Sequence, residues 1–393
     1  MNHEVISILG YFGYANTGDE AILSCMLEQL RQLKLDAEYF VYSGNPGETR
    51  RQHKVEAVPN ILPTSTKSYL IRALGRNRKN FFNTLKAFKR TTVFLVGGGG
   101  LFYDHPDSNF YLMELLTLIR KAAEAGKKVI LFGVGFGPIH LDSTRAALKE
   151  IIDRVTMITV RDEPSRKLLA ELGITRPEIH TTADFVYFLK PAPAERIDQI
   201  IKEERLEKTD RPVIGICLCG YHSDNQAWQD SLVRFCEFAD TDLKACLWFI
   251  PMQTGGGFDD RAAARQITTR LKNTEYISHI EGQYTARETM GLMARADMIL
   301  GERFHGVILA LNNQTPVFGL SYKPKVERVF AEIGRNDWNI RFDQLSPEGL
   351  IRGFKKVWNA RAELPGELQQ AHAMLLEKSR QNFTLLADLL KKD

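Results

Sequence analysis

Residues 298–311 read MILGERFHGVILAL, which predicts a short buried strand, a polar turn and a buried helix. Arg303 and His305 lie in the turn, where backbone N–H groups and the positive end of the helix dipole converge. Arg303 supplies a permanent cation, and His305 can exchange a proton near neutral pH. The stretch therefore predicts an anion-binding site with an acid–base group. The alternative is a structural ion pair for Arg303 and a packing role for His305.

The same alternation of apolar runs and amphipathic stretches extends along the 393 residues. Strand-like runs lie at residues 5–9, 37–42, 93–96, 129–132, 157–160, 213–218, 245–250, 298–300 and 316–320. Strand runs separated by helix-length segments are typical of βαβ units and parallel sheets. The predicted fold class is therefore α/β, with two Rossmann-like doubly wound domains. Because ligands bind beyond the carboxyl ends of such strands, we expect the domains to face each other across a cleft.

Proline and charge mark the expected domain boundaries. The KPAP run at 190–193 precedes a charged stretch, 196–211, which we interpret as a solvated connector helix. We therefore expect an N-terminal Rossmann-like domain over residues 1–190, a linker over 191–212 and a C-terminal Rossmann-like domain over 213–366. Pro365 and Gly366 mark a second break. The last segment, 367–393, is predicted to be a long amphipathic helix that can cross back to brace the N-terminal domain.

Composition excludes several classes of protein. Hydrophobic residues make up 44% and charged residues 25% of the chain, as in ordinary globular proteins, and a net charge of +4 is too small to imply nucleic-acid binding. The five cysteines form no C-x-x-C pair, so we expect reduced thiols, without a metal cage or a disulfide framework. The N-terminus lacks the pattern of a signal peptide, and no window approaches 18 apolar residues. We expect a cytoplasmic protein.

Glycine-rich turns follow three of the predicted strands, at residues 10–18, 97–100 and 133–138. Their spacing differs from the dinucleotide fingerprint, so we expect no nicotinamide cofactor. Asp19 and Glu20 follow the first turn and would repel a phosphate, which favours a neutral, hydroxyl-rich ligand such as a sugar. The alternative role of this loop is helix capping by Thr17 or Asp19. The four glycines at 97–100 allow a ligand or another backbone to approach closely.

Further cations follow other predicted strands. Arg161 comes directly after the run 157–160, and its alternative role is an ion pair with Asp162 or Glu163. Lys323 and Lys325 follow the last predicted strand, and consecutive strands are usually neighbours. We therefore expect both lysines beside the turn described above, unless they are simply solvated.

Residues 57–103 contain no Asp or Glu but eight cations, namely Lys67, Arg72, Arg76, Arg78, Lys79, Lys86, Lys89 and Arg90. Apolar side chains recur among them at roughly helical spacing, at Leu70, Leu74, Phe81, Leu85 and Phe88. A basic amphipathic helix of this kind can lie on an anionic membrane surface. The alternative is a helix that packs its apolar face on the sheet.

Taken together, these motifs resemble the polysaccharide pyruvyl transferase family. The matching features are the loop at 10–21, the glycine runs at 97–100 and 133–138, the residues 160–162, 183–184 and 301–306, and the loop at 322–323. The resemblance implies a GT-B-like fold that transfers pyruvate from phosphoenolpyruvate to a sugar as a cyclic ketal. It places this reaction in cell-wall or exopolysaccharide assembly at the inner face of the membrane, often on lipid-linked saccharides. Phosphoenolpyruvate is then a donor substrate, and no cofactor or metal is implied.

The resemblance also implies roles for individual residues, with the acceptor on the N-terminal and the donor on the C-terminal domain. The catalytic candidates are His305 and Lys323. The donor-binding candidates are Arg161, Arg303, Phe304 and Lys325. The acceptor-binding candidates are Asn16, Asp19, Asp104 and Asp184. The glycine run at 255–257 has no assigned role.

Phosphoenolpyruvate carries about three negative charges, which several cations can match. Two other classes remain open at this point: a sugar-nucleotide-dependent glycosyltransferase of the same architecture, and a non-catalytic saccharide-binding protein.

Overall fold

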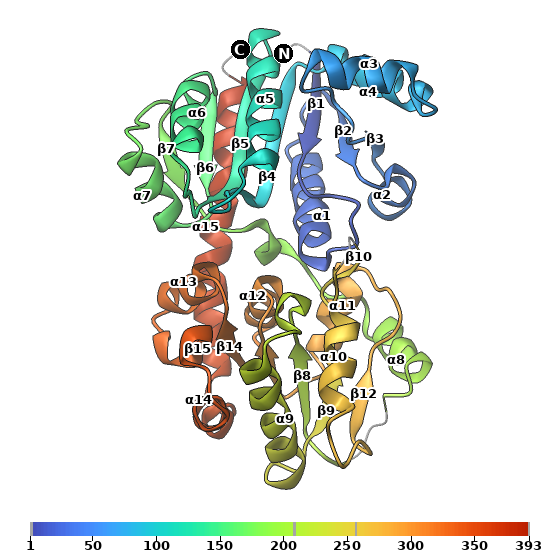
Figure 1. Cartoon of the computed structure of the whole chain (residues 1–393), viewed down its shortest axis with the longest axis vertical. Coiled ribbons are helices and arrows are strands. Elements are labelled where there is room, and N and C mark those ends of the chain that lie inside the picture. Colours follow the sequence, from blue (N-terminus) through green and yellow to red (C-terminus); the bar gives the residue numbers. More distant parts are fainter. Residues whose placement is uncertain (1–2, 207–209, 256–257, 392–393) are drawn as a thin grey trace. The chain divides into compact units, whose positions relative to one another are not determined.

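The structure, a computed structural model, describes residues 3–206, 210–255 and 258–391 (Figure 1). The chain forms two compact units. The first comprises Met1–Tyr14, Ile22–Phe185 and Leu375–Asp393, and the second comprises Ala15–Ala21 and Val186–Met374. The short segment Ala15–Ala21 therefore belongs to the second unit although it lies near the N-terminus.

The first unit contains a seven-stranded parallel sheet of order β3-β2-β1-β4-β5-β6-β7. Its strands are β1 (Glu4–Leu9), β2 (Ala37–Ser43), β3 (Glu56–Pro59), β4 (Val93–Phe102), β5 (Lys128–Phe136), β6 (Met157–Val160) and β7 (Ile179–Thr181). The helices that connect them are α1 (Thr17–Gln32), α2 (Pro46–His53), α3 (Thr66–Leu74), α4 (Arg78–Arg90), α5 (Phe110–Glu124), α6 (Asp142–Ile152) and α7 (Glu163–Glu171). The strand order reverses between β1 and β4, which is the mark of a doubly wound sheet.

The second unit contains a six-stranded parallel sheet of order β12-β9-β8-β13-β14-β15. Its strands are β8 (Val213–Cys217), β9 (Cys246–Phe249), β12 (Ile277–His279), β13 (Met298–Gly301), β14 (Val317–Ser321) and β15 (Asn339–Arg341), and a small antiparallel pair joins β10 (Thr254–Gly255) to β11 (Phe258–Asp259). Its helices are α8 (Ala194–Glu203), α9 (Gln226–Thr241), α10 (Asp260–Thr268), α11 (Ala286–Met293), α12 (Phe304–Asn312), α13 (Pro324–Glu332) and α14 (Pro347–Ala360). Short 3-10 turns lie at Phe185–Phe188, Gly220–His222, Asn336–Trp338 and Phe342–Gln344. The predicted fold class, two parallel doubly wound α/β sheets, is confirmed.

The stretch 298–311 folds as its pattern predicts. β13 lies in the middle of the second sheet between β8 and β14, and all four of its residues are buried. In α12 every residue except His305 is buried, so this helix is part of the hydrophobic core. Burial on this scale holds the intervening turn, Glu302-Arg303, in a fixed position.

Two predicted strand ends are wrong. β4 and β5 do not stop before their glycines but continue through them. Gly99 pairs with Val134, the register shifts between Gly99 and Phe102, and Phe102 pairs with Phe136 beyond the shift. Gly98 and Gly99 have φ of 77° and 78°, a conformation that only glycine adopts without strain, so the ladder bulges here and resumes.

The strands that lack an apolar run in the sequence are β3, β7, β12 and β15, apart from the two-residue strands of the hairpin. These four are the edge strands of the two sheets. Most of their residues are only half-buried, so the continuous apolar pattern of a central strand is absent from them.

The expected solvated connector helix is also wrong. The helix ends at Glu203, not near residue 211, and residues 207–209 lie outside the described part of the chain. α8 is amphipathic and buries Ile197, Ile200 and Ile201. A Cβ at Gly291 of α11 would stand 2.4 Å from Ile197 Cδ1, so the two helices pack closely within the second unit.

The last helix, α15 (Pro365–Lys391), begins at Pro365 itself, so this proline opens the helix rather than forming a separate break. In the part of α15 that belongs to the first unit, Asn382 is fully buried. Its Oδ1 accepts hydrogen bonds from the hydroxyls of Thr159 (2.5 Å) and Thr182 (2.9 Å), and its Nδ2 donates to the carbonyl of Ala183. These bonds anchor the helix to the strand β6 and the loop after β7. Across the described residues, no helix combines the length and the hydropathy that a membrane crossing requires.

Candidate functional site

The candidate site lies at the carboxyl edge of the second sheet. Four neighbouring strands end there, and each is followed by a loop that carries polar side chains: 218–222 after β8, 250–254 after β9, 302–305 after β13 and 322–325 after β14. Because β9, β8, β13 and β14 are adjacent in this order, their loops meet at one edge. This is where a doubly wound sheet binds its ligand.

Arg303 is buried in an ion pair with Asp260. Its Nε lies 3.1 Å and its Nη2 2.5 Å from the carboxylate, which is a two-point contact that fixes the plane of the guanidinium. Burial alone lowers the pKa of Arg303, but the Asp260 charge outweighs it and the net shift is upward. Arg303 is therefore a permanent cation, held at the first position before α12. The alternative role of Arg303, a structural ion pair, is therefore confirmed, and this pair fixes the orientation of the guanidinium.

Asp260 connects the loops of the site, and it is not among the candidate residues predicted from the sequence. Besides Arg303, its carboxylate accepts N–H groups of Gly220 (3.2 Å), Met252 (3.2 Å) and Gln253 (2.9 Å). Burial raises the pKa of Asp260, and Arg303 and these N–H groups oppose that rise. Its signal in the sequence is weak, because it is one of two consecutive aspartates beside the glycine run at 255–257, of which residues 256–257 lie outside the described residues.

Glu302 is a second buried acid that sequence reasoning passed over. Its Oε2 accepts the N–H of Cys219 at 2.7 Å, and its Oε1 contacts Nδ1 of His222 at 2.8 Å and Nε1 of Trp228 at 3.1 Å. Burial raises the pKa of Glu302, and the hydrogen bond from His222 opposes it. The acid holds the imidazole of His222 by one nitrogen, as acids hold catalytic histidines in many enzymes. The ring of His222 also packs on Tyr322 and Phe342.

His305 lies against the start of α1, within the same unit. A Cβ on Gly18 would stand only 1.8 Å from Nδ1 of His305, so the absence of a side chain at Gly18 makes room for the imidazole. The loop around Gly18 is in turn held by backbone bonds, from Thr17 to the carbonyl of Met252 (2.9 Å) and from Thr254 to that of Ala15 (3.2 Å). The two motifs that the sequence separates by almost 300 residues therefore form one site.

Asn16 caps α1, in place of the expected Thr17 or Asp19. Its Oδ1 accepts the N–H groups of Gly18 (3.0 Å) and Asp19 (3.1 Å), and its Nδ2 donates to Oε1 of Gln253 at 3.3 Å. The backbone N–H of Gln253 binds Asp260, so a continuous chain of polar contacts runs from Arg303 to the Asn16 loop. Asp19 follows in the first turn of the helix.

The two lysines lie at the start of α13. Lys323 is the residue before the helix and is exposed, and its ammonium lies 5.8 Å from the centre of the Tyr322 ring. Partial desolvation lowers the pKa of Lys323, and the charge of Arg303 acts in the same direction. Lys325 lies over the ring of Phe304, with its Nζ 5.4 Å from the ring centre.

Burial raises the pKa of Cys219 to about 11, so this thiol is not a nucleophile at neutral pH.

The candidates in the first unit have mainly local partners. Arg161 is buried, and its Nη1 lies 3.0 Å from Oδ2 of Asp184. Its Nε also pairs with Oδ2 of Asp162 at 3.9 Å, and Asp162 caps α7 as well. A Cβ on Gly135 would stand 2.9 Å from Nε of Arg161, so this glycine makes room for the guanidinium. The expected ion pair of Arg161 with Asp162 is therefore present, and Asp184 is a closer partner that the sequence did not indicate.

Asp104 ties two loops together. Its Oδ1 accepts the N–H of His140 at 2.6 Å and its Oδ2 that of Leu141 at 3.1 Å, which joins the end of β4 to the segment after β5. Both carboxylate oxygens of this acceptor candidate are thus used within the fold.

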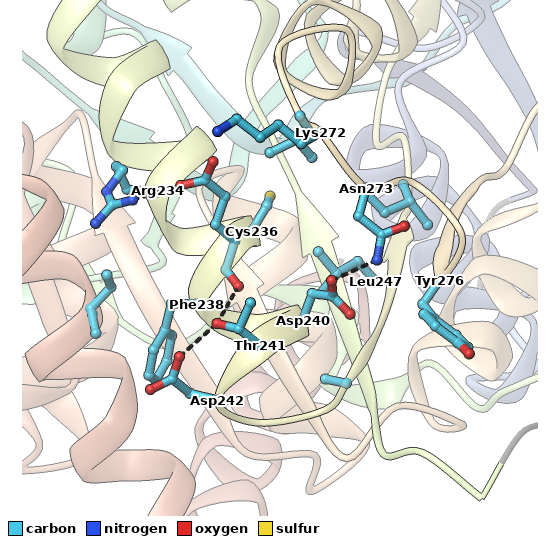
Figure 2. A pocket seen from close by; sticks show the side chains of 15 residues that line it. Arg234, Cys236, Phe238, Asp240, Thr241, Asp242, Leu247, Lys272, Asn273 and Tyr276 are labelled. Atoms are coloured by element: carbon cyan, nitrogen blue, oxygen red, sulfur yellow. Dashed lines mark hydrogen bonds and ion pairs between the residues drawn. The ribbon is translucent and has the colours of Figure 1, made fainter.

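A hollow of about 480 Å³ lies at the other edge of the second sheet, beside the start of β9 and β12. Figure 2 shows its polar side chains bound to one another: Asn273 donates to Asp240, and the hydroxyl of Thr241 donates to Asp242. The candidate residues of the sequence analysis are not part of its lining.

Comparisons with known proteins show which family and which fold this chain resembles. A model of the family described as polysaccharide pyruvyl transferase matches residues 16–324. The chain is 20% identical over 428 aligned residues to the amylovoran biosynthesis protein AmsJ of Erwinia amylovora, and the match covers 98% of this chain and 99% of that protein.

Solved structures resemble the whole chain. They include a glycosyltransferase from Rickettsia africae (TM-score 0.63, 11% identity, 100% of each chain). A UDP-GlcNAc 2-epimerase from Neisseria meningitidis is also similar (TM-score 0.64, 15% identity, 99% of this chain and 100% of that one). At these identities the likeness shows the fold alone, which is GT-B-like.

Proposed function

This chain belongs to the polysaccharide pyruvyl transferase family, and we propose that it transfers pyruvate from phosphoenolpyruvate to a sugar, forming a cyclic ketal. We propose as acceptor a saccharide of an exopolysaccharide or cell-wall precursor, carried on a lipid. The name of the relative AmsJ, an amylovoran biosynthesis protein, supports this class of acceptor.

The observation that carries the proposal is the convergence of Arg303, His305 and Lys323 at the carboxyl edge of one sheet. Arg303 precedes α12 and Lys323 precedes α13, so two helix N-termini add their N–H groups and dipoles to the two cations. A small trianionic donor needs such a concentration of positive charge. Lys325 and the ring of Phe304 complete the donor side of this site. Arg161, whose partner is Asp184, remains a further donor-binding candidate.

The reaction requires a proton donor, a base and stabilisation of the leaving phosphate. We assign the proton transfer to His305: its proton goes to the methylene carbon of the donor, and C2 becomes electrophilic. A sugar hydroxyl adds to C2 and gives its proton back to the now neutral His305, and phosphate leaves with the C2–O electron pair. A second hydroxyl then closes the ketal, and its proton passes to the released phosphate. Arg303 and Lys323 stabilise the departing phosphate.

The acceptor hydroxyls must reach His305, so we place the acceptor beside the start of α1. Asn16 and Asp19 lie on this helix end, which contacts His305 through Gly18. Asp19 offers a carboxylate that can accept a hydrogen bond from a sugar hydroxyl. We assign Asp104 and Asp184 less direct roles, because backbone N–H groups engage the first and Arg161 the second.

The direct test is incubation of the protein with phosphoenolpyruvate and lipid-linked saccharides, followed by mass spectrometry. The expected result is an acceptor that has gained one pyruvate ketal, with one phosphate released per product. Release of phosphate without a modified acceptor, or no turnover with any saccharide, would contradict the proposal.

A calorimetric titration separates this function from that of a nucleotide-sugar enzyme. Some solved structures of this fold contain UDP or UDP-GlcNAc. We expect phosphoenolpyruvate to bind and UDP or GDP to bind much more weakly. Tight binding of a nucleoside diphosphate, with no binding of phosphoenolpyruvate, would instead favour a glycosyltransferase.

A further inference from the structure

The pair of helices α3 and α4 forms an unusual part of the surface of the first unit. Figure 1 shows the pair at the periphery of this unit, beyond the edge of its sheet. α3 contains no buried residue, and α4 buries only Phe81 and Thr84. The ring of Tyr69 on α3 contacts that of Phe81 at 5.4 Å between centres, so α3 packs on α4 and not on the core.

The outward face of α3 is apolar. Leu70, Ile71 and Leu74 are 53%, 63% and 84% exposed, and Leu74 lies four residues from Leu70 and three from Ile71, which puts it on the same side of the helix as both. An isolated exposed leucine needs no explanation, but a contiguous apolar face marks an interaction surface. Phe82 on α4 is 48% exposed and is a further exposed apolar side chain of the helix pair.

The charge around this face has one sign. The eight cations of residues 57–103 all lie on α3, on α4 or in the turn between them, and no acid accompanies them. Arg90 is paired with Glu38, but within the described chain the other seven have no ion-pair partner. Arg78, Lys79 and Lys86 lie three or four residues from Phe82, so they flank it on the same side of α4. We call the exposed apolar side chains and these seven cations the α3–α4 surface.

We propose that the α3–α4 surface docks on an anionic lipid membrane. Its cations match lipid phosphates, and its aliphatic side chains need an apolar phase, which a bilayer provides at the level of the head groups. A nucleic acid would satisfy the cations but leave Leu74 and Ile71 in water. The inference stands on this surface alone and does not depend on the reaction proposed above, although it would bring the protein to lipid-linked acceptors.

Vesicle co-sedimentation tests the proposal. We expect the wild-type protein to bind phosphatidylcholine vesicles that contain phosphatidylglycerol, and to bind pure phosphatidylcholine vesicles far more weakly. Binding should weaken as salt is added, because the attraction acts within a Debye length. Wild-type protein that ignores anionic vesicles at low salt overturns the proposal, as does equal binding to both kinds of vesicle.

Charge variants identify the surface. The triple variant Arg76→Glu, Arg78→Glu, Lys79→Glu should bind at least about 100-fold more weakly, because each cation near such a membrane contributes roughly a fivefold factor. The matched control is Lys202→Glu, Arg352→Glu, Lys355→Glu, which makes the same change of net charge on exposed positions of α8 and α14. The control should retain binding. An equal loss in both variants would mean that net charge alone governs adsorption and would overturn the proposal.

Insertion of the apolar face is tested separately. The variant Ile71→Gln, Leu74→Gln keeps every charge. It should bind vesicles about 10-fold or more weakly, since it replaces two aliphatic side chains that become buried in the bilayer on docking. A polarity-sensitive dye on Leu74→Cys should report an apolar environment only with anionic vesicles, and it labels selectively because the five native cysteines are buried. Unchanged binding of the glutamine variant, or a dye that stays in water, overturns the proposal. So does binding to nucleic acid in a gel-shift assay without binding to vesicles.

Discussion

At the scale of single residues, the buried pair Arg303–Asp260 determines what a substitution can reveal. Removing the guanidinium leaves Asp260 as an uncompensated charge in the interior, and breaking such a pair costs about 3–5 kcal/mol of stability. Arg303→Ala would therefore combine a folding defect with a binding defect. A variant that keeps the charge but not the planar fork is the sharper probe.

We expect Arg303→Lys to weaken phosphoenolpyruvate binding about 10- to 100-fold, because a hydrogen bond to a charged group contributes about 1.5–3 kcal/mol and lysine cannot reproduce the fork. Calorimetry measures the affinity, and thermal unfolding checks the fold. The exposed Arg352→Lys on α14 serves as the control. An unchanged donor affinity in Arg303→Lys would remove this residue from the donor site.

His305 is expected to act in the chemical step. His305→Gln keeps a hydrogen-bonding side chain but cannot exchange protons near neutral pH, so turnover should fall about 10²–10⁴-fold. Donor affinity, measured by calorimetry, should change far less. If turnover stayed near normal, the acid would have to be sought among Lys323 and the Glu302–His222 pair.

The hydrogen bonds of Asp104 lead to a prediction about how the stability of the fold depends on pH. Burial alone raises the pKa of Asp104, but the N–H groups of His140 and Leu141, with a hydrogen bond from Thr144, outweigh it and lower the pKa below its usual 3.8. An acid with a lowered pKa stabilises the fold above its unfolded pKa, and this contribution is lost as the pH falls through the folded pKa.

The free energy of unfolding of the wild type should therefore drop more steeply below about pH 4 than that of Asp104→Asn, as denaturant titrations at several pH values would measure. The neighbouring exposed Asp107→Asn should follow the wild type. Parallel curves for Asp104→Asn and the wild type would contradict the assignment.

At the scale of elements, the start of α1 and the first turn of α12 pack against each other through Gly18 and His305. Gly18 is helical with ordinary backbone angles, so alanine is tolerated by the backbone and harms only through its contact with His305. Gly18→Ala should displace the imidazole and reduce turnover about 10²-fold, the scale expected for a misplacement of about 1 Å. The affinity for phosphoenolpyruvate should change little.

The control for this prediction is Gly366→Ala in the first turn of α15, where a Cβ meets no atom within 4 Å. Steady-state kinetics of the two variants, side by side, measure the difference. Equal turnover in both would show that the contact between Gly18 and His305 has no bearing on the chemistry.

At the scale of the whole molecule, α15 is anchored to the first unit through Asn382. Asn382→Ala leaves the hydroxyl of Thr159 without its acceptor, while that of Thr182 keeps the carbonyl of Val160, and an unsatisfied buried group costs about 1–3 kcal/mol. Denaturant unfolding should show this loss, and hydrogen exchange should place it in β6 and the end of α15. The adjacent exposed Gln381→Ala should leave stability within about 0.5 kcal/mol of the wild type.

The central strands and the buried helix α12 were predictable from the sequence because continuous apolar runs are found where an element is buried on all sides. The edge strands β7 and β15 were not, since a half-exposed strand of three residues carries no such run. The extension of β4 through its glycines was also hidden, because glycine marks a turn and a bulge equally well.

For the site, the sequence by itself determined the residue types that can bind an anion and exchange a proton, namely Arg303, His305 and Lys323, and their places after strands. Only the tertiary structure decided their partners. Asp260 and Glu302 became part of the site because long-range folding buries them beside Arg303 and His222, and a buried charge must find a partner. The contact between Gly18 and His305 was also decided by the tertiary structure. Contacts between distant segments depend on how the sheets order their strands, which local residue patterns do not encode.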